Sequence, residues 1–405
     1  LPVFETIERP LAVVLAEMEE VGFRLDGDGL AAYGRGLRHH LERLLEEIYQ
    51  LAGVDFNVNS PKQLGEVLFG RLQLPHGKKT KTGYSTNAEV LESLRPLHPI
   101  IQKILDYRTY SKLLSTYVEG LAKAVGPDGR IHTSFHQTET RTGRISSAEP
   151  NLQNIPVRTE LGRELRRFFV AEDGKRLIDA DYSQIELRVL AALADDRRMK
   201  DAFLSGEDIH TATASEVFGV PYHAVTPELR FRAKAVNFGI VYGIGAFSLS
   251  NDIGVSLNEA SHYIKNYLTR FSGVAAYMDQ AKQSARETGF AVTYFGRRRP
   301  IPELTASNKI TQAFGERVAM NAPIQGTAAD IIKRAMIGVY RRLQREGLQT
   351  KLILQIHDEL ILEGPVSEEE QAKRILIEEM EQAVDLPVPM RVDAHSGDNW
   401  YSAKQ

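Results

Sequence analysis

Acidic side chains stand at the ends of two strand-like segments that are far apart in the sequence. The segment 175–180 leads to Asp181, and the apolar segment 352–356 leads to Asp358 and Glu359 before the chain turns apolar again. An apolar run, a polar tip and an apolar return are typical of a β-hairpin. Mg²⁺ usually binds one or two carboxylates together with substrate phosphates, and paired ions promote phosphoryl transfer. These acids are candidate metal ligands, unless they only solvate the strand ends.

A segment that begins at Thr226 has the features of a helix that could bind a nucleoside triphosphate. Thr226 and Pro227 form a typical helix start, and Gly243 ends the pattern. Four side chains follow one another at intervals of four: Arg230, Lys234, Phe238 and Tyr242. Each is turned by about 40° from the last, so they form one ridge. The cationic half lies toward the positive end of the helix and suits phosphates, and the aromatic half suits a base. A solvated cationic face with two core aromatics is the alternative.

Composition restricts the class of protein. The 405 residues are 42% hydrophobic and 25% charged, which is typical of a folded globular chain and excludes a disordered or collagen-like one. The absence of cysteine excludes disulfides and thiolate metal sites, and we expect a reducing, cytoplasmic and nucleoid-associated location without a membrane partner. The net charge of −3 hides basic stretches such as 297–299. Such stretches on a neutral body fit a groove for a polyanion.

The periodicity of apolar residues predicts an α+β architecture. Apolar residues spaced by three and four over 30–51 and again over 101–121 predict two long helices, with a basic loop near 76–83 at the tip of a protruding arm. The segment 131–145 is strand-like, 175–180 reads as a buried strand and 351–364 as two strands. Helices are expected over roughly 184–290.

Several motifs together resemble family A DNA polymerases, the bacterial DNA polymerase I type. Residues 181–188 (DYSQIELR) resemble the first polymerase motif of that family, 230–243 (RFRAKAVNFGIVYG) the second and 355–359 (QIHDE) the third. Segments 142–147, 151–156 and 321–330 are similar to further family signatures, in the family's order. The resemblance covers essentially the whole chain.

The resemblance implies a right-hand polymerase fold with an antiparallel palm sheet. It assigns a thumb to residues 1–125, the first part of the palm to 126–190, fingers to 191–305 and the second part of the palm to 306–405. Because the chain opens at Leu1 and members of the family often carry nuclease domains upstream, we expect a C-terminal fragment without a proofreading exonuclease.

The resemblance also implies template-directed DNA synthesis from dNTPs on primer–template DNA, by a monomer. Asp181, Asp358 and the backbone carbonyl of Tyr182 would hold two Mg²⁺ ions, with Glu359 as a nearby catalytic carboxylate. Lys234 would be both catalytic and nucleotide-binding. The other residues that the resemblance places around the nucleotide are Arg230, His210, Gln184, Phe238, Tyr242 and Glu186. Of these, Glu186 resembles the family's steric gate, which fills the space of a ribose 2′-hydroxyl.

The same resemblance places a third set of residues on the DNA. They are Arg144, Asn151, Asn154, Arg317, Asn321, Gln325 and His357. Donors in the minor groove can test base-pair geometry without reading sequence, because the acceptors there are similar for all correct pairs. One departure from the family pattern is Phe231, where a basic residue is usual. Asp179 is a further acid, two residues before Asp181 on the same strand.

Two other functions stay open at this point. A single-subunit RNA polymerase relative would have to admit ribose, which Glu186 argues against. A catalytically inactive DNA-binding module would keep the fold without needing the catalytic residues. The presence of Asp181, Asp358, Lys234 and Arg230 argues against this alternative.

Overall fold

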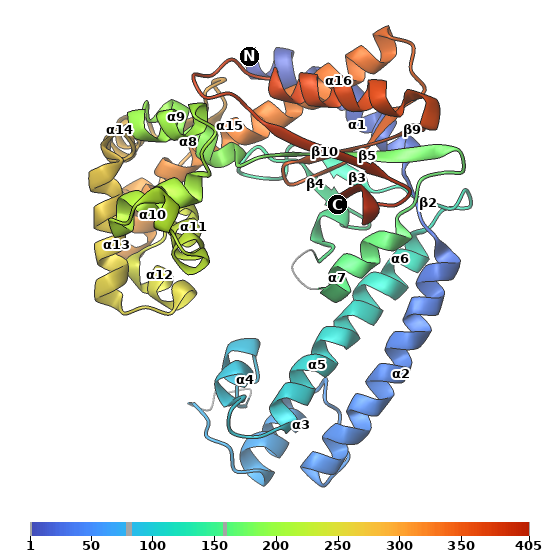
Figure 1. The fold of residues 1–405 in the computed structure, drawn as a ribbon. Coiled ribbons are helices and arrows are strands. Elements are labelled where there is room, and N and C mark those ends of the chain that lie inside the picture. The colour runs from blue at the N-terminus through green and yellow to red at the C-terminus, as the bar shows by residue number, and fades with distance from the viewer. Residues whose placement is uncertain (1, 78–82, 157–159, 405) are drawn as a thin grey trace.

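A four-stranded antiparallel sheet lies at the centre of the structure, a computed structural model that describes residues 2–77, 83–156 and 160–404. Its strands are β5 (Lys175–Tyr182), β8 (Lys351–Ile356), β9 (Glu359–Pro365) and β10 (Val392–Gly397), in the order β10-β5-β9-β8. The helices α15 (Lys309–Arg345) and α16 (Glu369–Glu381) cover one face (Figure 1). The predicted α+β class is confirmed.

The strand pairing follows from the apolar sequence of the strands. Leu360, Ile361 and Leu362 of β9 are fully buried, as a strand covered on both faces requires. The predicted hairpin is present, and residues 357 and 358 form the turn between β8 and β9. Asp181 on β5 stands directly opposite Glu359 on β9.

A helical lobe follows β5 in the chain and lies beside the sheet (Figure 1). Its helices are α8 (Ile185–Leu193), α9 (Arg197–Leu204), α10 (Ile209–Phe218), α11 (Pro227–Tyr242), α12 (Ala246–Ile253), α13 (Leu257–Arg270) and α14 (Ser272–Thr288). The prediction for α11 is confirmed at both ends. The Thr226 side chain accepts a hydrogen bond from the backbone N–H of Leu229, and Gly243 ends the helix with φ 67°.

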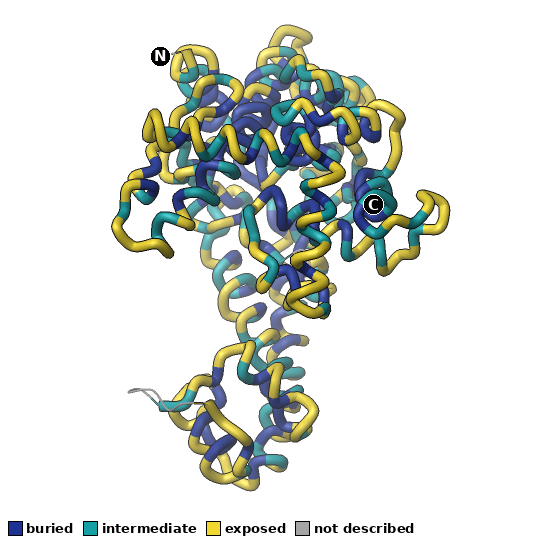
Figure 2. The backbone as a smooth tube through the Cα atoms, turned by 90° about the vertical axis from the view of Figure 1, so that its left-hand side faces the viewer, coloured by how far each residue is buried: buried dark blue, intermediate teal, exposed yellow. Residues whose placement is uncertain are grey.

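An arm of two long helices projects from the sheet (Figures 1 and 2). One is α2 (Gly27–Ala52), and the other runs through α5 (Ile100–Lys112), a π-helical segment Leu113–Val118 and α6 (Glu119–Ala124). With α3 (Pro61–Gly65) and α4 (Ala88–Leu94) they enclose a separate apolar cluster that includes Ile48, Leu64 and Ile104. Both long helices and the arm are confirmed, whereas most of the expected basic loop, residues 78–82, lies outside the described residues.

The prediction of a strand over 131–145 is largely wrong. The structure has only β2 (Arg130–Ile131) and β3 (Ser134–His136) there, and β4 (Ser146–Ala148) pairs with β3 after a loop. In that loop the Thr140 hydroxyl donates to the carbonyl of Arg144 at 2.6 Å, and Gly143 has φ 80°. Short polar side chains that bond to nearby backbone compete with strand pairing, which explains the loop.

The remaining elements join these parts. They are two π-helical segments, Phe4–Glu8 and Glu66–Arg71, with α1 (Arg9–Val21), β1 (Phe23–Arg24), α7 (Glu160–Glu164), β6 (Phe290–Val292), β7 (Arg298–Pro300) and short 3₁₀ turns. Within the described ranges, no helix has the length and apolar character needed to cross a membrane.

The separate cluster in the arm predicts a local effect of mutation. Ile104→Ala removes a fully buried side chain, and we expect it to lower the free energy of unfolding of the arm by about 2–5 kcal/mol. Hydrogen exchange of α5 amides would measure the effect. Ile310→Ala is the matched control, because Ile310 is 79% exposed. Equal protection of α5 in both variants would contradict the prediction.

Candidate active site

The acids that are distant in sequence meet at one end of the sheet. The pairing of β5 with β9 brings Asp181 opposite Glu359, and the backbone N–H of Tyr182 donates to the carbonyl of Asp358 at 3.1 Å. Asp179 is buried two residues earlier on β5. Four carboxylates therefore share one small volume.

Burial and mutual repulsion perturb these acids. Burial raises the pKa of Asp358 to about 7, and the charge of nearby Asp181 adds to the effect. Burial also raises the pKa of Asp179 well above its usual range, and so does its hydrogen bond with Glu359. Burial is the main cause of both raised pKa values, and the negative charge of neighbouring carboxylates adds to it.

The unpaired oxygens of this cluster fit a divalent cation. Oδ1 of Asp181 and Oδ2 of Asp179 are sealed from solvent and accept no hydrogen bond. In the described part of the chain no three acidic or histidine side chains form a metal-binding group by themselves. Asp181 and Asp358 make a pair of carboxylates, the number that Mg²⁺ commonly takes alongside substrate phosphates. The Tyr182 hydroxyl donates to the carbonyl of Met380 in the core, so only the backbone of Tyr182 is near the cluster.

Two residues near the C-terminus contact the cluster and were missed by sequence analysis. Trp400 Nε1 donates to Glu359 Oε1 at 2.8 Å, and Lys404 Nζ lies 2.8 Å from Glu359 Oε2 and 3.0 Å from Asp181 Oδ2. Nothing in the spacing of residues 400–404 signals such contacts, because they depend on how the end of the chain folds back on the sheet.

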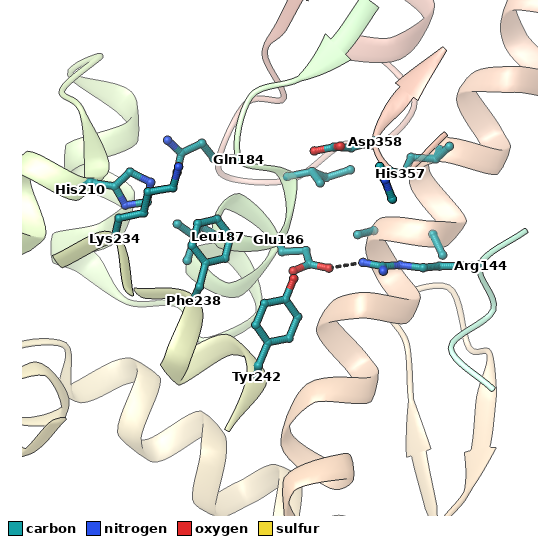
Figure 3. Close-up of a pocket in the computed structure, with 14 residues that line it drawn as sticks. Arg144, Gln184, Glu186, Leu187, His210, Lys234, Phe238, Tyr242, His357 and Asp358 are labelled. Carbon is teal, nitrogen blue, oxygen red and sulfur yellow. Dashed lines mark hydrogen bonds and ion pairs between the residues drawn. The ribbon is translucent and has the colours of Figure 1, made fainter. Parts of the chain in front are cut away.

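A cavity of about 350 Å³ adjoins the acids on the side of the helical lobe (Figure 3). His210 and Lys234 lie on one side of it, and His357 and Asp358 lie on the other. Its lining also includes Arg144, Gln184, Glu186, Phe238 and Tyr242. The structure thus brings together, around one cavity, most residues that the sequence analysis placed at the nucleotide.

His210 is held neutral with a defined tautomer. Thr213 Oγ1 donates to Asn237 Oδ1 at 3.1 Å, which turns the Asn237 amide nitrogen toward His210 Nδ1 at 3.0 Å. Nδ1 is therefore the acceptor and Nε2 carries the proton. Burial lowers the pKa of His210 to about 4. The imidazole can thus offer one N–H donor without a charge.

Arg230 is not among the residues that line this cavity. Its Nε and Nη2 make a bidentate ion pair with Asp208, at 2.9 and 2.7 Å. Asp208 also caps α10 by accepting from the N–H of Thr211. The departure from the family pattern at Phe231 is a ring that is 60% exposed, and Arg232 pairs with Glu228 at 2.7 Å.

The aromatic half of the ridge on α11 packs beside Glu186. The rings of Phe238 and Tyr242 are stacked with centroids 6.3 Å apart, and Tyr242 lies against Glu186 (Figure 3). Glu186 in turn forms an ion pair with Arg144 at 2.6 Å. Burial raises the pKa of Tyr242 to about 12, and the charge of Glu186 adds to this. These contacts make Glu186 a fixed wall of the cavity.

The residues expected on the DNA divide into two groups. Arg317, Asn321 and Gln325 follow one face of α15, and Asn321 Nδ2 donates to the carbonyl of Tyr242 at 2.7 Å. Arg144, Asn154 and His357 line a second cavity beside the first. Gln153 and Gln355 also line this second cavity, and sequence analysis missed both.

Asn151 has a local structural contact. Its side chain accepts from the backbone N–H of Gln153 at 3.0 Å and begins a 3₁₀ turn, Leu152–Asn154.

Backbone strain marks two residues of the site. Gln184 has φ 59° and His357 has φ 53°, a region that residues other than glycine rarely adopt. Gln184 begins α8, and its Oε1 is buried without a hydrogen-bond partner. Strained residues cluster at functional sites, which agrees with the position of both beside the cavity.

Comparison with known proteins shows the family. Residues 28–402 match the sequence model of DNA polymerase family A, so the chain belongs to that family. DNA polymerase I of Caldicellulosiruptor bescii is 52% identical over 99% of this chain and 47% of that protein. DNA polymerase I of Geobacillus stearothermophilus is 53% identical over 98% of this chain and 46% of that protein. The chain thus spans about half the length of these curated relatives.

A solved structure supports the same fold. The POL domain of Pol1 from M. smegmatis, in complex with DNA primer–template and dNTP, superposes with a TM-score of 0.92 at 44% identity. The match covers 98% of this chain and 71% of the other chain. The right-hand polymerase fold expected from the motifs is confirmed.

The neutral state of His210 predicts a pH dependence of stability. The imidazole binds a proton near pH 6.5 in the unfolded chain but only near pH 4 in the folded one. The unfolded state therefore holds more protons between these values. We expect the free energy of unfolding to fall as the pH drops from about 6.5 to 4, by at most about 1.4 kcal/mol per unit.

Urea unfolding of the wild type and of His210→Gln at several pH values would measure this contribution. The difference between the two free energies should shrink as the pH falls through this window. If the free energies of unfolding of the two proteins instead change in parallel with pH, His210 has the same pKa in the folded and unfolded states.

Proposed function

We propose that this chain catalyses template-directed addition of deoxynucleotides to a primer 3′-hydroxyl, with release of pyrophosphate. The observation that carries the proposal is the single cavity that joins Asp358 to Lys234 and His210. A triphosphate across it would have its α-phosphorus toward the acids and its outer phosphates toward the cationic side. The similar Pol1 domain is described in complex with primer–template and dNTP, which supports these substrates.

Lys234 and His210 supply different kinds of donor to the triphosphate. Lys234 offers a positive charge, and the neutral His210 offers the Nε2–H. As the 3′ oxygen bonds to the α-phosphorus, the bond to the pyrophosphate oxygen breaks and negative charge grows on the leaving group. Lys234 lies on the side where that charge would develop, and fixed charges there lower the barrier. Arg230 would also bind the triphosphate, by giving up its ion pair with Asp208 for one with a phosphate.

Asp181, Asp358 and the backbone carbonyl of Tyr182 are the groups we assign to two Mg²⁺ ions. Bound there, such ions would lower the pKa of the primer hydroxyl and stabilise the departing oxygen. Glu359 is engaged by Trp400 and Lys404, so we assign it no direct contact with metal.

The sugar would lie against the wall formed by Glu186, Phe238 and Tyr242. Glu186 is held by Arg144 at 2.6 Å and cannot easily move away from an extra 2′-hydroxyl. Ribonucleotides would then be rejected by collision or by a poorly paired carboxylate. We therefore favour deoxynucleotides as the substrates.

The DNA would approach along α15 and the second cavity. Arg317, Asn321, Gln325, Arg144, Asn154 and His357 are the residues we assign to it, with Asn151 shaping the nearby turn. In this assignment the arm within 1–125 is the thumb, 126–190 and 306–405 form the palm, and 191–305 form the fingers. We further propose that the chain acts as a monomer and has no 3′→5′ exonuclease activity.

Primer extension tests the catalytic proposal directly. With Mg²⁺, a DNA template and dNTPs, we expect the wild type to extend a labelled primer. Asp358→Ala should lower the rate by about 10³-fold or more while primer–template binding persists. Asp173→Ala, at a fully exposed acid, is the control and should keep the rate. Tight binding without extension by the wild type would leave a DNA-binding module instead.

The position of Glu186 beside the sugar predicts that this residue selects deoxyribonucleotides over ribonucleotides. Glu186→Ala opens space beside the sugar, and we expect the rate with rNTPs relative to dNTPs to rise by at least about tenfold. Glu186→Gln keeps the volume and removes the charge, so it should stay selective if the effect is steric. Single-nucleotide incorporation rates measure both variants. Unchanged selectivity in Glu186→Ala would exclude this residue as the gate.

A further inference from the structure

Lys404 lies within the acidic cluster although it is next to the last residue of the chain. Its Nζ is 2.8 Å from Glu359 Oε2, 3.0 Å from Asp181 Oδ2 and 3.5 Å from Asp179 Oδ1. The acceptors come from two strands, β5 and β9. The side chains of Asp179 and Glu359 are 2% and 6% exposed, whereas those of Lys404 and Asp181 are 27% and 41% exposed. The Coulomb attraction of Lys404 to the two buried acids is therefore screened less by water than the attraction between surface charges.

Contacts made by residues 399–402 hold Lys404 in this position. Trp400 is fully buried, stacks edge-on against Phe169 with centroids 5.5 Å apart and donates to Glu359. Asn399 and Ser402 exchange hydrogen bonds that close the turn before Lys404. These contacts place the ammonium group of Lys404 next to the acids.

Lys404 contacts three of the four acids. Asp179, Asp181 and Glu359 share this cation, and Glu359 also accepts a hydrogen bond from Trp400. Asp358 has no ion pair in the described parts of the chain, and Oδ1 of Asp181 has no partner at all. Buried oxygens without a protein donor therefore remain on Asp181 and on Asp179, and of these two residues only Asp181 is among those to which we assigned the metals.

We propose that Lys404 is a positioning residue that holds Glu359 and Asp179 away from the metals and competes with the incoming cation for Asp181. This inference rests on the proposed metal-dependent function. With a metal ion on Asp181, Lys404 gives up its contact with Oδ2 of that residue and keeps Glu359 and Asp179. The site then binds a divalent cation less tightly than its four acids alone would, and it binds the cation through Asp181 and Asp358.

The change in charge predicts the direction in which Lys404→Gln shifts the affinity for a divalent cation. Lys404→Gln removes a positive charge close to the metal position and frees three carboxylates at once. Both changes favour a divalent cation. We expect the dissociation constant of Mn²⁺ to fall by about tenfold, which corresponds to about 1.4 kcal/mol. A side chain that merely fastened the chain end would alter stability and leave this constant unchanged.

The experiment is a titration of the wild type and the variants with Mn²⁺, followed by the loss of the free-ion signal in electron paramagnetic resonance. Lys175→Gln is the matched control, because Lys175 begins the same strand β5 and pairs with Glu172 at 2.6 Å, at the opposite end from Asp181. Asp181→Asn should lose the tight site. Tighter Mn²⁺ binding in Lys404→Gln but not in Lys175→Gln supports the proposal.

Two outcomes separate this inference from the proposed function. A wild type that binds no Mn²⁺ would overturn the metal assignment itself and this inference with it. A wild type that binds Mn²⁺ through Asp181, with the same affinity in Lys404→Gln, would overturn only the role of Lys404.

A second measurement on the wild type covers the case in which Lys404→Gln does not fold. Lysine acylation can be followed by mass spectrometry with and without Mg²⁺. Lys404 should react faster once Mg²⁺ has taken Asp181 from it, whereas Lys175 should react at the same rate. A rate at Lys404 that does not respond to Mg²⁺ would contradict the proposal.

Discussion

The antiparallel pairing of β5 with β9 is the constraint on which the site depends. Register places Asp181 opposite Glu359, and the two-residue turn before β9 then sets Asp358 beside Tyr182. A slip of one residue would turn Asp181 to the other face of the sheet and leave buried charge among apolar side chains. The full burial of Leu360, Ile361 and Leu362 opposes such a slip, so the apolar core fixes the geometry of the charged cluster.

The helical lobe has to present a second set of residues to this fixed edge. Residues 183–350 leave the sheet after β5 and return at β8, and Gln184, in a strained conformation, begins the excursion. Asn321 on α15 binds the carbonyl at the end of α11, which ties the ridge of Lys234, Phe238 and Tyr242 to the helix that packs on the sheet. The cavity is therefore set by two anchors, Gln184 at the start of the inserted segment and the hydrogen bond between Asn321 and Tyr242 within it.

Much of this arrangement could be predicted from sequence, because it depends on local signals. The ends of α11 follow from a threonine cap, a proline and a glycine, and the hairpin 351–365 follows from its apolar pattern. The strand predicted over 131–145 was wrong, since side-chain hydrogen bonds to backbone are not visible in apolar periodicity. Lys404, Trp400 and the pairing of Arg230 with Asp208 depend on long-range folding, which no spacing of residues encodes.

Three cations of the site share a feature that bears on how a ligand would bind. Arg230 is paired with Asp208, Arg144 with Glu186 and Lys404 with Asp181. Without a ligand each charge is already neutralised by an acid of the same chain, which avoids the cost of an unpaired, partly buried charge. At these three positions a ligand must exchange with an acid, whereas Lys234, which also lines the cavity, has no ion pair within the described residues. Under the proposed function, only a group with comparable charge and geometry would make that exchange favourable, and the internal ion pairs would then contribute to selectivity for a polyanion.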